Sequence, residues 1–319
     1  MNIVILGAGG IGCYFGARLL ESGHEVTFVG RGEHLAALKE EGLYLEHSDF
    51  SFSDQIKAMS IEELALEIDP NSVDVVLVTL KSMVTPEAAE RCAQWIKLAK
   101  KWPFFVSLQN GVDNETCFTE SLGIEKVIGG LTRRIGANID SPGKISATGS
   151  AETIIGCWPN SEETVTSDPR RGFIELLEKS FNEAGIPTEI TLDIRKQLWK
   201  KLVINNSVNG LAALVQERTG TILKDSLLPR LVMEMMQETG IAAKGDGVYL
   251  SQDDINEMFD LICTFESIKP SMLIDRERGR PLEIDEICEV VLQRSEKLGI
   301  DAPYTRTVST LLRFDLKKN

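Results

Sequence analysis

The chain has 319 residues, which is more than one ordinary domain needs and enough for two. Its 43% apolar residues can fill two cores, which excludes an intrinsically disordered chain. The formal net charge of −14 repels phosphate backbones and anionic lipids, so we expect no nucleic-acid and no membrane partner.

The cysteines and the first residues give no sign of a metal site or an export signal. Six scattered cysteines form no C-x-x-C pair, which predicts buried reduced thiols, and we expect no metal. The first twenty residues are apolar, but they lack a basic leader and contain five glycines, unlike a signal sequence. No apolar run approaches the roughly eighteen residues that span a bilayer, so we expect a cytoplasmic protein.

Strands and helices alternate over the first hundred residues. Residues 2–6 are predicted as a strand that runs into a glycine-rich turn, an amphipathic helix to about residue 21 and a second strand at 25–29. Buried-type strands are predicted again at 73–80 and 104–108. This alternation predicts a mostly parallel sheet with helices on both faces.

The texture changes twice further along the chain. From 127 to 157, glycines and short Ser/Thr-rich runs predict antiparallel strands at the edge of the sheet, followed by a helix at 172–184 and a strand near Thr188. From Asp193 onward the pattern is helical. The sequence therefore predicts an α/β Rossmann-type domain with an antiparallel extension (1–192) and an all-α domain (193–319).

Within the second domain, capping residues suggest where helices begin. Asp193 is a candidate N-cap for a long helix that reaches residue 214. Asp253 or Asp254 is expected to open another helix, and a further helix is expected after Pro281.

The glycine-rich turn has the spacing of a dinucleotide-binding site. Gly7 permits the tight turn, Gly9 lets a pyrophosphate approach the backbone, and Gly12 allows the helix to pack closely on the sheet. The helix N-terminus adds free N–H groups and a positive dipole end. A turn with no ligand is the alternative, but the strand before it and the helix after it favour a cofactor site. The expected cofactor-binding residues there are Gly7, Ala8, Gly9, Gly10, Ile11 and Gly12.

The end of the second strand indicates which dinucleotide binds. NAD enzymes place an acid there, whereas this chain has Gly30-Arg31-Gly32 and no acid before Glu33. An arginine can clamp a 2′-phosphate, so NADP is favoured over NAD. Arg31 could instead stack on adenine or face solvent. Lys81, at the end of a later strand, is either a second cation for the cofactor or a solvated lysine.

Lys201, Asn205 and Asn209 form a polar stripe on an otherwise apolar helix. At helical spacing the three residues drift by only about 80° and share one face. Asparagine is unfavourable inside helices, so two on one stripe need an explanation. One interpretation is a polar floor for a ligand, and the other is the solvent-facing edge of a surface helix.

The available side chains narrow the chemistry of that stripe. All three histidines lie in the first fifty residues, and no Tyr-x-x-x-Lys pattern is present. Carbonyl reduction needs a proton donor at the developing alkoxide, and lysine is the best remaining candidate.

At this point the sequence resembles the ketopantoate reductase family (2-dehydropantoate 2-reductase) over nearly its whole length. Seven patches in the family's order carry the resemblance: the glycine turn at 7–12, Val-Gly-Arg-Gly at 29–32, Val-Thr-Leu-Lys at 78–81, Gln-Asn-Gly at 109–111, the Trp-Lys-Lys-Leu helix from 199 with its asparagines, Pro-Ser-Met-Leu-Ile-Asp at 270–275, and Glu-Ile-Asp at 283–285.

The resemblance implies NADPH-dependent reduction of 2-dehydropantoate to (R)-pantoate, a step of pantothenate biosynthesis. Lys201 would be the general acid, with Glu283 beside it to tune its charge or orientation. Asn110 would contact the nicotinamide-side ribose, and Arg31 and Lys81 would bind the NADP phosphate and adenosine. Asn205, Asn209 and Ser271 would bind the 2-keto acid. A homodimer is compatible with this interpretation.

One departure from the family pattern leaves the substrate open. Family members carry an asparagine three residues before the Ser-Met pair, where this chain has Ile268. An alternative is therefore a reductase of a different branched 2-keto acid, and a more distant one is a protein that binds NADPH without turnover. Simpler roles also exist, since Ser271 could cap a helix and Glu283 and Asp285 could be first-turn acids.

Overall fold

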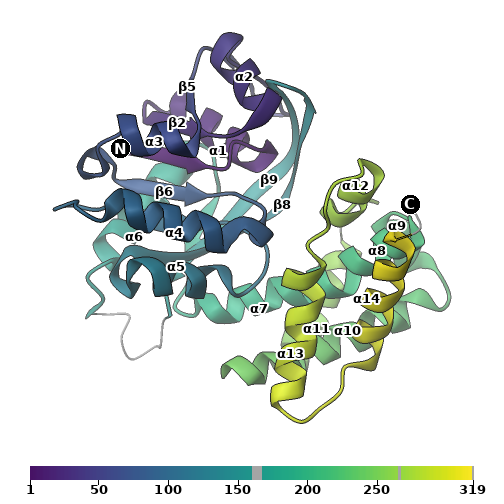
Figure 1. Ribbon diagram of the computed structural model, residues 1–319. Coiled ribbons are helices and arrows are strands. Elements are labelled where there is room, and N and C mark those ends of the chain that lie inside the picture. The colour runs from purple at the N-terminus through teal and green to yellow at the C-terminus, as the bar shows by residue number, and fades with distance from the viewer. Residues whose placement is uncertain (160–166, 265–266, 318–319) are drawn as a thin grey trace. The chain divides into compact units, whose positions relative to one another are not determined.

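In the computed structural model, which describes residues 1–159, 167–264 and 267–317, the chain divides into two units (Figure 1). The first unit comprises Met1–Gln109 and Asp113–Ile194, and the second comprises Asn110–Val112 and Arg195–Asn319. The first unit contains the sheet and the second is helical, so the predicted fold class is confirmed.

One sheet organises the first unit. In chain order its strands are β1 (Asn2–Leu6), β2 (Glu25–Val29), β3 (Leu43–Glu46), β4 (Ser51–Asp54), β5 (Lys57–Met59), β6 (Val75–Val78), β7 (Phe104–Ser107), β8 (Val127–Ser141), β9 (Lys144–Cys157) and β10 (Thr188–Ile190). Their order across the sheet is β4-β3-β9-β8-β7-β6-β1-β2-β5, with β10 paired to β9.

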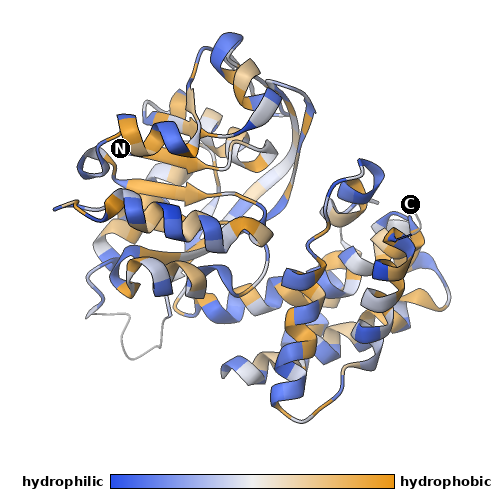
Figure 2. Cartoon of the chain, viewed as in Figure 1, coloured by the Kyte–Doolittle hydropathy of each residue, from blue (hydrophilic) through white to orange (hydrophobic). Residues whose placement is uncertain are grey.

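The centre of the sheet is parallel, as predicted. β1 lies between β2 and β6, and β6 pairs with β7, all in parallel register. β6 is apolar along its whole length and β1 from Ile3 onward, as expected for strands that helices cover on both faces, and Figure 2 shows β6 as hydrophobic. A parallel arrangement of this kind brings the carboxyl ends of β1, β2 and β6 to the same edge of the sheet.

The predicted antiparallel strands are present, but they do not form the edge of the sheet, because β3 and β4 continue it beyond β9. β8 pairs parallel to β7 at its start and then forms a long hairpin with β9, with a register shift between Arg133 and Ile135. The strands β3, β4 and β5 were not predicted. They are only three or four residues long, and several of their residues are exposed, so they lack the apolar run that marks the central strands.

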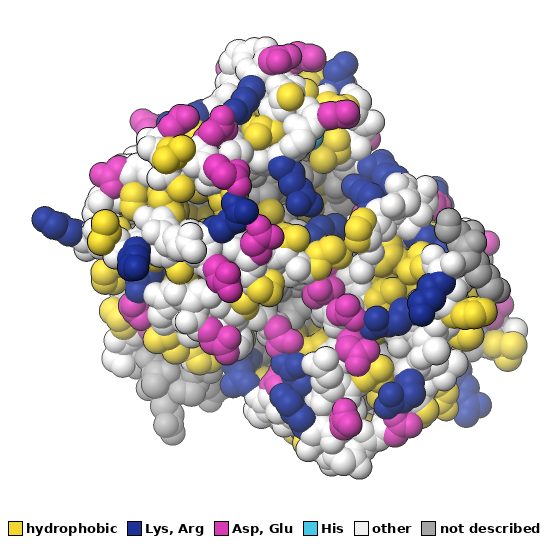
Figure 3. All heavy atoms as spheres, viewed as in Figure 1, with side chains coloured by type: hydrophobic (Ala, Val, Ile, Leu, Met, Phe, Trp, Pro, Cys, Tyr) yellow, Lys and Arg dark blue, Asp and Glu magenta, His cyan; other side chains and the backbone are white. Residues whose placement is uncertain are grey.

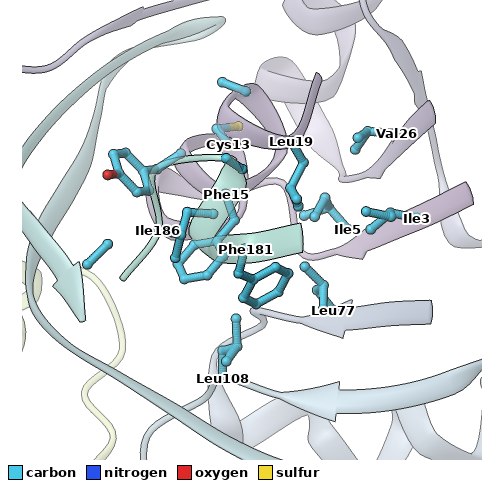
Figure 4. Packing of buried hydrophobic residues seen from close by; sticks show 14 of the residues in the cluster. Ile3, Ile5, Cys13, Phe15, Leu19, Val26, Leu77, Leu108, Phe181 and Ile186 are labelled. Carbon is cyan, nitrogen blue, oxygen red and sulfur yellow. The ribbon is translucent and has the colours of Figure 1, made fainter. Parts of the chain in front are cut away.

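Helices pack on the sheet through its alternating side chains. The elements that connect the strands are α1 (Gly10–Glu21), α2 (Gly32–Glu40), α3 (Ile61–Glu67), η1 (Pro70–Ser72), η2 (Ser82–Val84), α4 (Thr85–Ile96), α5 (Asn114–Leu122), η3 (Ile124–Lys126) and α6 (Arg171–Glu183). On one face, the ring of Phe15 (α1) packs edge-on against the ring of Phe181 (α6), with 5.8 Å between the ring centroids. The two rings lie over Ile5 and Leu77 (Figure 4). On the other face, Phe118 of α5 stacks on Phe105 of β7.

Helices make up the described part of the second unit beyond Ile194. In chain order they are α7 (Ile194–Ile204), η5 (Asn205–Asn209), α8 (Gly210–Val215), α9 (Thr219–Lys224), α10 (Leu228–Ala242), η6 (Ala243–Asp246), α11 (Gln252–Cys263), α12 (Ser271–Glu277), η7 (Asp285–Glu289), α13 (Val290–Lys297) and α14 (Pro303–Leu316). α10 packs against η5, α13 and α14, and α8 packs against α12 and α14.

Two expectations about these helices need correction. The long helix after Asp193 begins as predicted, but η5 interrupts it with a π-helical turn. Neither Asp253 nor Asp254 is the N-cap of α11. Ser251 is, and its hydroxyl accepts from the Asp254 N–H while the Asp254 carboxylate accepts from the Ser251 N–H.

On the face that Figure 3 shows, Asp and Glu side chains are mixed with Lys and Arg side chains and do not gather in one field. Local cations are therefore present on this face despite the net charge of −14.

Candidate active site

Backbone hydrogen bonds attach the glycine-rich turn to the end of β2. The N–H groups of Gly7 and Ala8 both donate to the Val29 carbonyl, at 3.0 and 2.8 Å. The Thr79 hydroxyl, after β6, donates to the Gly7 carbonyl at 2.7 Å. Gly7 has a φ of +117°, and a Cβ built on it would lie 2.7 Å from the Leu80 nitrogen, so no other residue fits there.

The space in front of α1 suits a phosphate group. A Cβ built on Gly9 would meet no described atom within 4 Å, whereas one on Gly12 would lie 2.2 Å from the Gly7 carbonyl oxygen. Gly9 is the N-cap of α1, with no side-chain cap and no acid in the first turn. An uncapped helix start without a carboxylate attracts an anion, so these residues fit a dinucleotide pyrophosphate.

Two cations occur at the same edge of the sheet. Arg31 is exposed and is the N-cap residue of α2, directly after β2. Lys81 is exposed and precedes η2, after β6. Because β2 and β6 flank β1 in parallel register, both residues follow strands that end beside the glycine turn.

Gln109, for which no role was predicted, lies just after β7. Its side chain is buried, and its amide donates to the Leu80 carbonyl at 3.1 Å and to the Thr85 hydroxyl at 2.8 Å. It therefore ties the segment after β7 to the segment after β6. The sequence shows a glutamine next to a buried strand, but it does not show the partners of that glutamine, because they lie 24 and 29 residues away.

In the second unit, two consecutive lysines have different surroundings. Lys200 is only 9% exposed, and its Nζ lies 2.7 Å from Glu257 and 3.6 Å from Asp254. Lys201 is half-buried and lies in the last turn of α7. Lys200 is thus a structural ion-pair partner, like Lys196 on the same helix, whose Nζ lies 3.0 Å from Asp254, whereas Lys201 is the half-buried lysine of the pair.

The π-turn changes the geometry assumed for the polar stripe. Asn205 and Asn209 both lie in η5, where a hydrogen bond spans one residue more than in an α-helix. The rotation per residue is therefore smaller than the α-helical value used to align the stripe. Asn209 is 7% exposed and Asn205 is half-buried, which does not fit the solvent-facing edge of a surface helix.

Asn206 is a buried residue that the stripe did not include. It is fully buried, and its amide donates to the hydroxyls of Thr239 and Thr305, both at 2.9 Å. These bonds hold η5 against α10 and α14. Of the two consecutive asparagines, Asn206 therefore fixes the turn, whereas Asn205 is half-buried.

Asn110 and Glu283 lie together in the second unit. Glu283 is 4% exposed, and its Oε2 accepts a hydrogen bond from the Asn110 side chain at 3.4 Å. Glu283 precedes η7, and η7 packs against η5, which carries the two asparagines. Burial raises the pKa of the nearby Glu286, and the negative charges of Glu283 and Asp285 act in the same direction.

Ser271 and Ile268 flank the start of α12. Pro270 is the N-cap, so Ser271 is the first helical residue, exposed, and does not cap the helix. The Ile268 side chain is 46% exposed, while its backbone carbonyl and N–H bind the backbone and hydroxyl of Thr219 at 3.0 and 3.1 Å. The backbone at 268 is therefore held in place independently of its side chain.

The predicted residues thus form two groups. Arg31, Lys81 and the glycine turn share one edge of the sheet in the first unit. Lys201, Asn205, Asn209, Glu283, Asn110 and Ser271 belong to the second unit. In residues 1–159, 167–264 and 267–317, no cluster of His, Cys, Asp or Glu could hold a metal ion, and no helix is long and apolar enough to cross a membrane.

Known protein families match both parts of the chain. The family described as ketopantoate reductase PanE/ApbA matches residues 3–160, and the ketopantoate reductase PanE/ApbA C-terminal family matches residues 193–315. The 2-dehydropantoate 2-reductase of Pyrococcus abyssi is 30% identical over 95% of this chain and 94% of its own. That of Archaeoglobus fulgidus is 27% identical over 98% and 97%.

Solved structures agree with these matches. A 2-dehydropantoate 2-reductase from Geobacter metallireducens superposes with a TM-score of 0.83 at 31% identity, covering 99% of this chain and 100% of its own. A D-mandelate dehydrogenase in complex with NADH superposes with a TM-score of 0.85 over 100% and 99%, and at 22% identity it shows only a shared fold.

Proposed function

The chain belongs to the ketopantoate reductase family, and from that premise we propose that it reduces 2-dehydropantoate to (R)-pantoate with NADPH. It is an oxidoreductase, and a small 2-keto acid is the substrate class consistent with its family. In this proposal residues 1–192 bind the cofactor, and residues 193–319 bind the substrate and supply the proton.

The residues of the first unit support dinucleotide binding. Gly7, Gly9 and Gly12 shape a turn with open space before the uncapped start of α1, where a pyrophosphate would receive backbone hydrogen bonds. Arg31 follows β2, where an enzyme selective for NAD would carry an acid. An arginine at this position supports a preference for NADPH, because it can bind the 2′-phosphate. When bound, the nicotinamide supplies the hydride.

The residues of the second unit support proton transfer and substrate binding. We assign the general acid to Lys201, whose ammonium donates a proton to the keto oxygen and stabilises the developing alkoxide. Asn205 and Asn209 donate hydrogen bonds to the substrate, and Ser271 holds its carboxylate. Asn110 contacts the cofactor ribose and Glu283 orients Lys201.

The observation that carries this proposal is the contrast between Lys200 and Lys201. The first is buried in an ion pair with Glu257 and Asp254. The second is half-buried at the junction with η5, whose asparagines are buried or half-buried. A proton donor needs this partial burial, because water competes for the substrate oxygen at an exposed ammonium.

A direct assay tests the proposal. Purified full-length protein is mixed with 2-dehydropantoate and either NADPH or NADH, and the loss of absorbance of the reduced nicotinamide is followed. We expect turnover with kcat/KM higher for NADPH than for NADH. Binding of NADPH without turnover of any 2-keto acid would reject the catalytic assignment.

Ile268 favours a second candidate, a reductase of another branched 2-keto acid. It presents a 46% exposed apolar side chain at the position where the family pattern has an asparagine. An isoleucine offers no hydrogen bond to a substrate hydroxyl and prefers an apolar substituent. A panel of branched 2-keto acids ranked by kcat/KM separates the two substrates.

A further inference from the structure

His34 has no part in the proposed chemistry, yet its ring joins three elements around the glycine turn. It is half-buried on α2. The Gly143 N–H donates to its Nδ1 at 3.1 Å, and its Nε2 lies 3.8 Å from the sulfur of Cys13, whose thiol donates to the Ala8 carbonyl at 3.5 Å. Since Nδ1 accepts from Gly143, the proton of the neutral imidazole lies on Nε2, which faces the Cys13 sulfur.

The surroundings of the ring favour this neutral form. Burial lowers the pKa of His34, and the backbone carbonyl of Ala8 opposes that shift. Burial raises the pKa of Cys13, so the Cys13–His34 pair is not a thiolate–imidazolium couple and offers no nucleophile.

The partner Gly143 belongs to the turn between β8 and β9, and it is the buried residue of this turn. Gly143 has a φ of +76°, and its carbonyl accepts from the Tyr44 N–H at 2.9 Å. A Cβ built on it would lie 3.4 Å from Ala37 of α2. The same hairpin reaches the start of α1, where a Cβ on Gly10 would lie 2.2 Å from the Ala137 carbonyl oxygen.

The glycine turn is therefore supported from outside by the hairpin, and His34 links this hairpin, through Gly143, to Cys13, whose thiol bonds the Ala8 carbonyl. Arg31, the N-cap of α2, lies three residues before His34. A shift of α2 moves this arginine relative to the turn that holds the pyrophosphate.

We propose that His34 is a positioning residue of the cofactor site, holding α2 with Arg31 in register with the β8–β9 turn through Gly143 and with the glycine turn through Cys13. Its imidazole thereby sets the affinity for the dinucleotide and the preference for the 2′-phosphate. This inference rests on the proposed function, since it concerns the same cofactor.

Substitutions at His34 separate its contacts with Gly143 and with Cys13. His34→Leu removes the polar atoms that make both contacts. His34→Asn keeps an acceptor at the position of Nδ1 for the Gly143 N–H, and His34→Gln keeps a donor that reaches toward the Cys13 sulfur. His47→Leu is the matched control, because His47 binds the carbonyl of Gly149 on the same hairpin at 2.7 Å.

The dissociation constants of NADPH and NADH are measured by titration calorimetry on the full chain, with the thermal midpoint and kcat at saturating NADPH in parallel. For His34→Leu we expect NADPH affinity to fall about tenfold, as for the loss of one or two buried hydrogen bonds. NADH affinity falls less, kcat changes little, and the Asn and Gln variants lie between His34→Leu and the wild type. His47→Leu binds both dinucleotides like the wild type.

The outcomes are distinguishable. Unchanged NADPH affinity in the His34 variants overturns the inference alone, and so does an equal loss for both dinucleotides, which removes the link to Arg31. If His34→Leu does not fold, the Asn and Gln variants decide, and wild-type affinity in both of them overturns it. A wild-type chain that binds neither dinucleotide overturns the proposed function and this inference together.

Discussion

The side chain of Asn110 donates a hydrogen bond to Glu283 at 3.4 Å, across 173 residues of the sequence. Asn110 follows β7 of the sheet, yet it groups with the second unit together with Gly111 and Val112. A residue proposed to contact the cofactor ribose is thus bonded to the buried carboxylate proposed to orient the proton donor. In the proposed mechanism, this side-chain pair links cofactor contact to proton donation.

Glu283→Gln tests the role of the charge in this pair. Glutamine keeps an oxygen that accepts from Asn110 but removes the negative charge that stabilises an ammonium group. We expect kcat/KM to fall, and its decline at high pH to begin at a lower pH, because Lys201 then loses its proton more readily. NADPH affinity stays within about twofold. The measurement is the pH profile of kcat/KM.

The control for that experiment is Asp285→Asn. Asp285 is two residues away, and its carboxylate accepts from Arg313 at 2.6 Å on the exposed side of η7. We expect a profile like that of the wild type. If Glu283→Gln and Asp285→Asn shift the profile equally, the effect is a general one of net charge and Glu283 has no special role.

The two adjacent lysines give a second prediction. Lys201→Ala should lower kcat about 10²- to 10⁴-fold, the usual contribution of a positioned proton donor, and leave NADPH affinity nearly unchanged. Lys200→Ala should retain kcat but lower the thermal midpoint, since it leaves Asp254 and Glu257 without one of their partners. Steady-state kinetics and thermal denaturation of both variants decide the assignment. Equal kcat losses would contradict it.

The sequence was most informative where local geometry dictates residue type. β1, the glycine turn, α1 and β2 were predicted with near-correct bounds, because a tight turn and a close helix–sheet contact each demand glycine at a fixed position. The hairpin of β8 and β9 was predicted from composition. By contrast, β3 to β5 are short and partly exposed, so their pattern resembles that of loops.

The site residues that escaped prediction are those whose partners are distant in the chain. Asn206 is fixed by Thr239 and Thr305, and His34 by Gly143, 109 residues away. No local pattern reports such bonds. The π-turn at η5 was missed for a different reason: an extra residue in one turn leaves helical composition unchanged, although it alters which side chains share a face.

Asp254 gives a prediction about stability and pH. Burial would raise its pKa, but hydrogen bonds from Ser251 and the charge of Lys196 outweigh burial and lower the pKa to about 2. A carboxyl whose pKa is depressed by folding stabilises the protein above its unfolded pKa and loses that effect as the pH falls. The contribution is roughly 1–2 kcal/mol at neutral pH, after allowance for the partial exposure of Lys196, and it disappears between about pH 4 and pH 2.

Asp254→Asn should therefore lower the free energy of unfolding at pH 7 by about that amount, and the difference from the wild type should shrink toward pH 2. Denaturant unfolding of the full chain at several pH values measures it. Asp253→Asn is the control, because Asp253 is exposed on the same helical turn and should have little effect. A difference that does not depend on pH would show that the loss of the helix cap alone destabilises the protein.

Ile268→Asn tests how the chain recognises its substrate. Its backbone is held by Thr219, so the substitution changes only a half-exposed side chain. An amide there can bind a substrate hydroxyl or carboxylate, and we expect kcat/KM for 2-dehydropantoate to rise about fivefold to tenfold, the value of one hydrogen bond. Ile300→Asn is the matched control, since Ile300 has nearly the same exposure, 47% against 46%.

A rise of about a hundredfold or more, with a loss of kcat/KM for a branched keto acid that lacks the hydroxyl, would identify that keto acid as the natural substrate. No change in either variant would place Ile268 outside the substrate site.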